Sequence, residues 1–155
     1  MSSPAYLARQ LDLVVTGPTW HGSPLGELLG DVSSVEARAH PIPGAHSIVE
    51  LVIHLTAWCE IAGRRLAGET GEATDAQDWP RADASTEERW RSAVRGLGAR
   101  YADIARAAGA LSEKELNAML AGRTHTAADM LHGLVAHAAY HGGQIALLKK
   151  ALRDS

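Results

Sequence analysis

Three histidines are the residues of this chain whose types and spacing are best suited to chemistry. His137 and His141 stand four residues apart in a segment, residues 130–148, that reads as a helix, so their side chains lie one turn apart on one face. Apolar residues share this face, which indicates that it points inward. Two buried imidazoles need polar partners, because an unpaired buried polar group costs roughly 1–3 kcal/mol. A divalent metal ion would satisfy both.

The four-residue spacing is weak evidence by itself, because eight histidines in one chain produce such a pair readily by chance. The alternative is two histidines satisfied by neighbouring groups. His54 strengthens the metal hypothesis, since it borders the apolar stripe of a second expected helix, over residues 47–66, and could face the helical pair. Three protein ligands leave a coordination position open for water or substrate, as in catalytic zinc sites. Imidazole suits zinc, nickel, copper and iron, so the ligands alone do not select the metal.

Several residues near these histidines have two interpretations each. Gln144 would either orient a metal ligand or be an interior amide whose hydrogen bonds are made within the protein. Tyr140 is expected to have a packing role. Glu50 would either hold an imidazole in place or cap the helix at whose start it stands. His21 and His46 precede that helix and would approach the mouth of the site or stay apart from it. The spacing does not decide between these interpretations.

The elements that must position the histidines are helices. Apolar residues repeat with the 3.6-residue period in four long segments, and β-branched runs typical of strands are nearly absent. The expected helices cover approximately residues 4–15, 47–66, 85–108 and 126–153. Helix-start signals of the S-x-x-E type begin at Ser33, Ser47, Ser85 and Ser112, with a weaker version at Thr126 and a Ser-Pro start at Ser23. We therefore expect an all-α four-helix bundle with short connecting helices.

Composition limits the functional classes. The 155 residues amount to one domain, expected over 1–155, and no apolar run is long enough to span a membrane. The N-terminus lacks the features of a signal peptide, so a cytoplasmic location is the expectation. The net charge is −3 and the basic residues are scattered along the sequence, so the composition does not indicate nucleic-acid binding. The single cysteine, Cys59, excludes an intramolecular disulfide and is expected to be a small buried apolar residue.

Two segments resemble a known family. Residues 46–58, HSIVELVIHLTAW, and 137–145, HAAYHGGQI, look like the corresponding parts of the DinB-like, or YfiT-like, metal-binding four-helix proteins. Residues 20–25 and the P-x-P-G run at 41–44 are similar to the same group. The resemblance implies an up-down-down-up bundle, often a homodimer. It also implies a divalent metal ion, commonly nickel or zinc, bound by the histidines that match the family's ligand positions: His54, His137 and His141.

The site and the resemblance together lead to three functional hypotheses. The first is a metal-dependent hydrolase, in which metal-activated water attacks an unknown small-molecule substrate. The second is a metal-dependent thiol S-transferase that uses a low-molecular-weight thiol, with cations for a charged cosubstrate available from Arg64, Arg65, Arg81 or Arg123. The third is a metal-binding stress-response protein without catalytic activity. The sequence leaves open whether the protein is an enzyme.

Two properties of the assembled protein are also expected. The pair Gly142–Gly143 lies inside a helix that it weakens, so a close approach of another helix, such as one from a homodimer partner, is a plausible reason for it. Metal-ligating histidines must be neutral, so metal affinity is expected to fall as the pH drops through roughly 6.5.

Overall fold

Helices account for the regular structure of this protein. The computed structural model describes residues 3–154, and within this range an isolated bridge between Met119 and Thr126 is the only β-type pairing. The helices are α1 (Pro4–Thr16), α2 (Leu25–Gly30), α3 (Ser34–Arg38), α4 (Ile48–Leu66), α5 (Asp75–Asp78), α6 (Glu87–Ala110), α7 (Glu113–Leu116) and α8 (Ala127–Arg153). The expected all-α class is confirmed. Residues 1, 2 and 155 of the expected 1–155 domain lie outside the described part.

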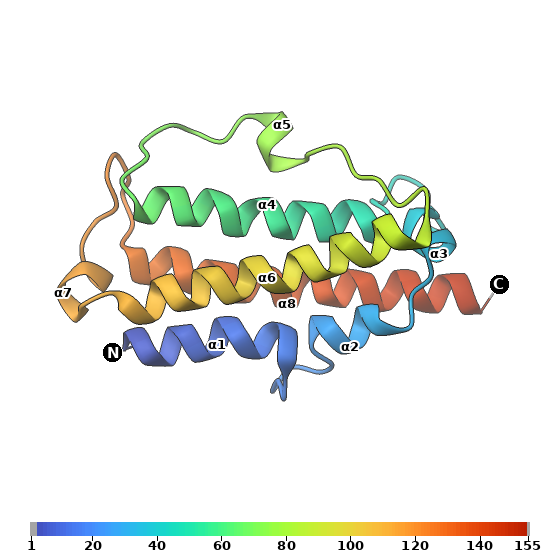
Figure 1. Ribbon diagram of the computed structural model, residues 1–155, viewed down its shortest axis with the longest axis horizontal. Coiled ribbons are helices and arrows are strands. Elements are labelled where there is room, and N and C mark those ends of the chain that lie inside the picture. The colour runs from blue at the N-terminus through green and yellow to red at the C-terminus, as the bar shows by residue number, and fades with distance from the viewer. Residues whose placement is uncertain (1–2, 155) are drawn as a thin grey trace.

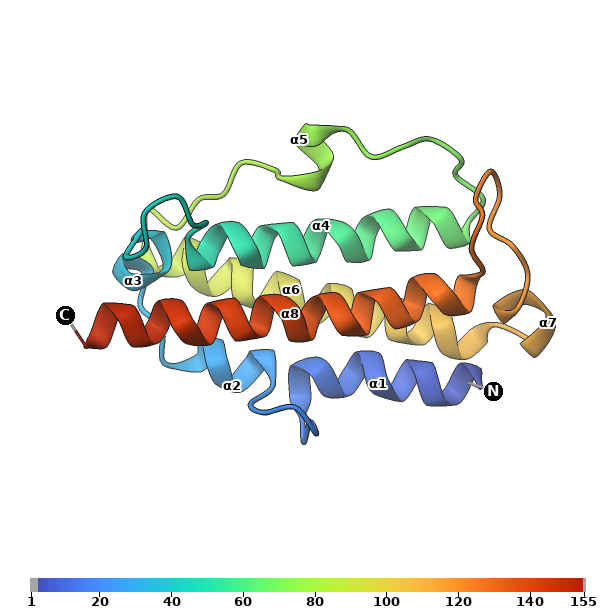
Figure 2. The same cartoon turned by 180° about the vertical axis from the view of Figure 1, so that it is seen from behind.

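The four long helices α1, α4, α6 and α8 form a bundle. Figures 1 and 2 show α1 and α8 running in one direction and α4 and α6 in the other, with the short helices in the connections. Each long helix contacts two others, α1 and α4 both packing on α6 and on α8. The antiparallel helices α4 and α8 therefore lie side by side.

The core of the bundle is apolar and belongs to all four long helices, because each turns one stripe of its helical repeat inward. The largest fully buried side chains on these helices are Leu7, Leu11, Ile48, Leu51, Leu55, Trp90, Leu97, Tyr101, Leu131 and Ile145. Burying one side chain of this size stabilises the folded protein by about 1.5–3 kcal/mol relative to leaving it exposed. This continuous core fixes α4 and α8 side by side.

Most of the predicted helix starts are confirmed. Four of the expected capping residues accept, through their hydroxyl groups, a hydrogen bond from the backbone N–H three residues on: Ser33, Ser47, Ser112 and Thr126. The carboxylate of the acidic residue at that position in turn accepts from the backbone N–H of the capping residue. Such reciprocal caps satisfy backbone donors that a helix end would otherwise leave unpaired. The start of α4, which carries His54, is set in this way by Ser47 and Glu50.

Two predicted starts were wrong. Thr86, and not Ser85, caps α6, since its hydroxyl accepts from the Arg89 backbone while the Ser85 backbone N–H is held by Asp83. Helix α2 begins at Leu25 without a side-chain cap. Its expected capping residue, Ser23, instead donates its hydroxyl hydrogen to the Glu27 carboxylate at 2.7 Å.

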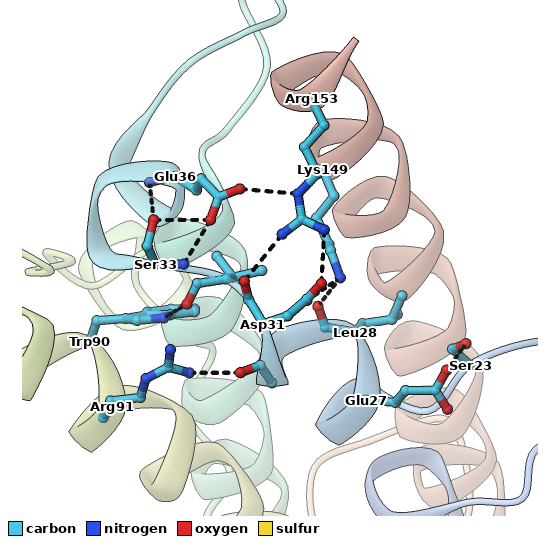
Figure 3. Close-up of polar contacts among 12 residues, drawn as sticks. Ser23, Glu27, Leu28, Asp31, Ser33, Glu36, Trp90, Arg91, Lys149 and Arg153 are labelled. Atoms are coloured by element: carbon cyan, nitrogen blue, oxygen red, sulfur yellow. Dashed lines mark hydrogen bonds and ion pairs between the residues drawn. The ribbon is translucent and has the colours of Figure 1, made fainter.

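A polar clamp fixes the end of α8 to the connection between α2 and α3 (Figure 3). The carboxylate of Asp31 accepts from Lys149 at 2.6 Å and from Arg153 at 2.8 Å. These hydrogen bonds from cations hold the pKa of Asp31 well below its usual range. In the same region the indole of Trp90 donates to the Val32 carbonyl at 2.6 Å, which ties α6 to this connection.

Candidate metal centre

His54 of α4 meets His137 and His141 of α8 in the space between the two helices. The Nε2 atom of His137 lies 2.9 Å from Nε2 of His54 and 2.9 Å from Nε2 of His141. One ring nitrogen from each histidine lies within 4.8 Å of the others, with His54 and His141 buried and His137 partly buried. The three imidazoles are thus close enough together to hold a metal ion.

The Nδ1 atoms of His54 and His141 both have hydrogen-bond partners. Nδ1 of His54 donates to the backbone oxygen of Asp78 at 2.7 Å, and Nδ1 of His141 donates to Oε1 of Gln144 at 2.5 Å. A neutral imidazole carries one hydrogen, so Nε2 of His54 and Nε2 of His141 both present lone pairs to His137. His137 can supply a hydrogen to one of them only. The donor set therefore fits a cation placed among the three Nε2 atoms, with each partner on Nδ1 fixing the ring orientation.

The surroundings of His137 and His141 favour their neutral forms. Burial, and then the nearby His141 and His54, lower the pKa of His137 to about 4. Burial also lowers the pKa of His141, against the hydrogen bond with Gln144, which raises it. A neutral imidazole is the form that binds a metal ion, so these two ligand candidates are ready at neutral pH.

Asp78 is the main participant that the sequence analysis missed. Its carboxylate Oδ1 lies 3.2 Å from Nδ1 of His54 and accepts from the indole nitrogen of Trp58 at 2.7 Å. The residue ends α5, a short helix that Figure 1 shows in the long connection above α4, outside the helices expected from the sequence. The capping box of Thr74 and Gln77 is the sequence signal that could have indicated it.

Trp79 forms a second, aromatic support for the cluster. Its ring stacks on His54 with centroids 3.9 Å apart and planes 9° apart. His46 stacks on the same ring at 3.7 Å and 12°. Both stacks are close and nearly parallel, so the indole is held between His46 and His54. His46 thus lies near the cluster but is separated from it by the indole.

The other residues with open interpretations take structural positions. The Glu50 carboxylate accepts from the Ser47 backbone at 2.7 Å, which is the capping role, and lies 3.7 Å from His46. His21 lines a separate hollow between α2 and α8. Tyr140 is exposed, where packing was expected. Gln144, by contrast, orients His141 directly.

Two further expectations concern Cys59 and the glycine pair. Cys59 is buried, and burial raises the pKa of its thiol to about 12, so it behaves as the expected apolar residue. At Gly142 an added Cβ would lie 3.6 Å from Leu25 and Leu28 of α2, so the closely approaching helix belongs to this same chain. Gly143 faces open space.

A cavity of about 460 Å³ opens beside the histidines. Its lining comes mainly from α4 and α8 and comprises His54, Trp58, Ala62, Asp78, Met130, Gly133, Leu134 and His137. Most of these residues are apolar, and the Asp78 carboxylate is the acidic group among them. The volume suits a small molecule.

The fold and the site define a class, that of all-α bundle proteins with a three-histidine cluster between two helices. The sequence matches the family model of the DinB superfamily over residues 20–145, and the chain belongs to this superfamily. Searches of curated proteins and of solved structures gave no match. Within residues 3–154, none of the helices has both the length and the apolar character required to cross a bilayer.

Proposed function

We propose that this protein is a metal-dependent hydrolase in which His54, His137 and His141 bind one divalent ion, zinc or nickel, through their Nε2 atoms. The observation that carries the proposal is the pair of Nε2 lone pairs directed at His137 with both Nδ1 atoms already donating. Three imidazole ligands suit either metal and leave room for further ligands. When bound, such an ion lowers the pKa of a coordinated water and polarises a substrate carbonyl or phosphoryl group.

The residues of the chain have distinct tasks in this proposal. The apolar wall formed by Trp58 and Leu134 holds the substrate body beside the histidines and excludes bulk water. The carboxylate of Asp78 lines the same cavity and orients His54, so it is placed to accept a proton from water that enters. Gln144 keeps the Nδ1 hydrogen of His141 turned away from the cluster.

An activity screen tests the reaction class. Zinc-loaded and nickel-loaded protein would be assayed on panels of small esters, amides and phosphoesters, with and without low-molecular-weight thiols, beside the His137→Ala variant. The proposal expects thiol-independent hydrolysis that the variant has lost. Turnover that requires a thiol would replace it with the S-transferase hypothesis. Stoichiometric metal without turnover on any panel would favour the non-enzymatic metal-binding role.

We propose further that the protein forms a homodimer through the outer face of α8. Tyr140 and Leu147 are 65% and 63% exposed and stand two turns apart on this face, with the open Gly143 between them. Two large exposed side chains on one helix face can pack against their copies across a two-fold axis. Sedimentation should show a dimer at micromolar concentration and a monomer for the Tyr140→Glu/Leu147→Glu variant. A monomeric wild-type protein would contradict the dimer.

The whole chain, 1–155, is proposed to form one domain of this family, although the family match begins at residue 20. Helix α1 supports this, because Leu7, Leu11 and Val14 are buried against the bundle. Limited proteolysis should release no stable fragment that lacks α1. Accumulation of a folded fragment beginning near residue 20 would contradict the single domain.

A further inference from the structure

Two buried guanidinium side chains lie near the C-terminal end of α4: Arg65 belongs to α4 itself, and Arg123 to the connection between α7 and α8. The Arg65 and Arg123 side chains are 10% and 7% exposed. Arginine is rarely buried to this extent unless its charge is fully paired. The arrangement therefore raises the question of what balances the two positive charges.

One exposed carboxylate joins both guanidinium groups. Glu72 lies 3.8 Å from Nη2 of Arg65 and forms a close ion pair with Nη1 of Arg123, yet its side chain is 80% exposed. Arg123 also donates to the backbone oxygens of Thr70 and Gly71. A single carboxylate thus bridges two guanidinium groups, and this local group keeps an excess of positive charge.

The pairing leaves unused hydrogen-bonding capacity. Nε of Arg65 and Nε of Arg123 are buried and have no acceptor among residues 3–154. Burial, followed by the nearby Arg123, lowers the pKa of Arg65, which shows that the neighbouring charge opposes its own. The adjacent Glu69 pairs with Arg64 at 3.0 Å. The excess positive charge of the two guanidinium groups therefore favours an additional oxyanion.

Arg65 packs on Trp58, one of the residues that line the cavity beside the histidines. Cζ of Arg65 is 5.4 Å from the centroid of the Trp58 ring, and the same ring is 6.0 Å from the ring of His137. Trp58 and Ala62 on α4, with Met130 on α8, line the cavity on this side. One indole therefore separates the Arg65 guanidinium from the histidine cluster.

We propose that Arg65 and Arg123 form an oxyanion subsite next to the cavity, on the side of Trp58 where Arg65 packs. A small molecule with a carboxylate or phosphate group would place this group between the two guanidiniums and lay its uncharged body along Trp58 toward the histidines. Guanidinium groups bind both oxyanions through paired hydrogen bonds. The exposed Glu72 carboxylate occupies the position that the ligand's oxyanion takes over. The subsite would select small carboxylates or phosphates as substrates of the proposed metal centre, and this role rests on the proposed function.

A purely structural arrangement predicts a different behaviour. If Arg65, Arg123 and Glu72 only fasten the two loops together, removing the Glu72 charge weakens the fold and creates no affinity for anions. If Glu72 occupies a ligand position, removing its charge frees that position, and the affinity for anions rises. The effect of neutralising Glu72 therefore separates the two interpretations.

The test is calorimetric titration of the metal-free protein with inorganic phosphate, acetate and hexanoate at constant ionic strength. Glu72→Gln should bind at least one of these anions about fivefold or more tightly than the wild type. Glu69→Gln, which removes a neighbouring carboxylate of the same loop, should not differ from the wild type. Arg65→Gln and Arg123→Gln should bind about tenfold or more weakly. Hexanoate as the tightest ligand would indicate a carboxylate with an apolar body, and phosphate a phosphoester.

Equal affinity in Glu72→Gln, Glu69→Gln and wild type would overturn the subsite, as would unchanged binding in both arginine variants. Circular dichroism would be recorded for every variant, and if the arginine variants unfold, the comparison of the two glutamine variants decides. The same titrations on His137→Ala separate the two proposals. Anion binding that survives in this variant belongs to the subsite, whereas its metal content reports on the histidine cluster alone.

Discussion

The imidazole of His54 is held by both the backbone and the side chain of Asp78. Its Nδ1 atom lies 2.7 Å from the backbone oxygen and 3.2 Å from the carboxylate Oδ1. Asp78 also accepts from Trp58, so α5 is attached to α4 at the point where His54 enters the cluster. The connection between α4 and α6 therefore forms part of the site.

Replacing Asp78 by alanine should lower the affinity for zinc about tenfold. The backbone bond to His54 remains, but the carboxylate that supports the ring and Trp58 is lost, and groups in this position typically contribute a factor of 10 to 100. Competition with a chromophoric chelator measures the change. Asp75→Ala, on the exposed side of the same short helix, is the matched control and should leave the affinity unchanged. Equal affinities in both variants would contradict the orienting role.

Gln144→Leu should also weaken zinc binding by about tenfold, because it removes the acceptor at 2.5 Å from Nδ1 of His141. Gln144→Glu keeps an acceptor at the same place and should retain the affinity or increase it. The pair is compared by the same chelator competition. If leucine and glutamate have the same effect, Gln144 contributes only packing.

The lowered pKa of His137 predicts how metal binding depends on pH. With its pKa at about 4 rather than 6.5, this ligand loses no metal affinity to protons between pH 8 and 6. Its competition with protons begins only as the pH approaches 4, lower than the value of roughly 6.5 expected from ordinary histidines. Calorimetric titration with zinc at pH 7, 6 and 5 gives the contribution of His137 as the difference in zinc affinity between the wild type and His137→Ala. A contribution of His137 that already falls between pH 7 and pH 6 would contradict the lowered pKa.

The same shift predicts the acid stability of the metal-free protein. The unfolded chain binds a proton at His137 below pH 6.5, whereas the folded protein keeps this imidazole neutral until about pH 4. The unfolded state therefore binds more protons in this window, and the free energy of unfolding falls as the pH falls. Urea unfolding at pH 7 and pH 5 should show a smaller loss in His137→Ala than in the wild type. An equal loss would show that another group is responsible.

Trp90→Phe should lower the free energy of unfolding by about 1–3 kcal/mol. The change leaves the buried Val32 carbonyl, now 2.6 Å from the indole nitrogen, without its donor. Trp20→Phe serves as the control, because Trp20 is fully exposed, and it should stay within about 0.5 kcal/mol of the wild type. Urea unfolding measures both. A similar effect for the two variants would contradict the structural role of the Trp90 bond.

The long helices could be predicted because their signals are local. Apolar residues at helical spacing and capping boxes at Ser47 and Thr126 set α4 and α8 to within a residue of the expected bounds. Placing His137 and His141 on one inward face needs no more than this periodicity. The all-α class follows from the same local patterns.

The support around His54 could not be predicted, because it depends on a contact between segments distant in sequence. Asp78 lies 24 residues beyond His54, and nothing local indicates that the connection folds back over α4. The stacking of Trp79 on both His46 and His54 has the same origin. At the start of α6, the Ser85 backbone N–H bonds to Asp83 and Thr86 is the cap, which the S-x-x-E pattern does not reveal.

The central claim is that His54, His137 and His141 bind one divalent ion. The most direct measurement is the metal content per chain, after chelation, reloading with zinc or nickel and removal of excess metal, for three proteins. Wild type and His132→Ala, an exposed histidine on the same helix, should each retain one ion, and His54→Ala/His141→Ala should retain essentially none. Equal metal content in the wild type and the double variant would contradict the claim.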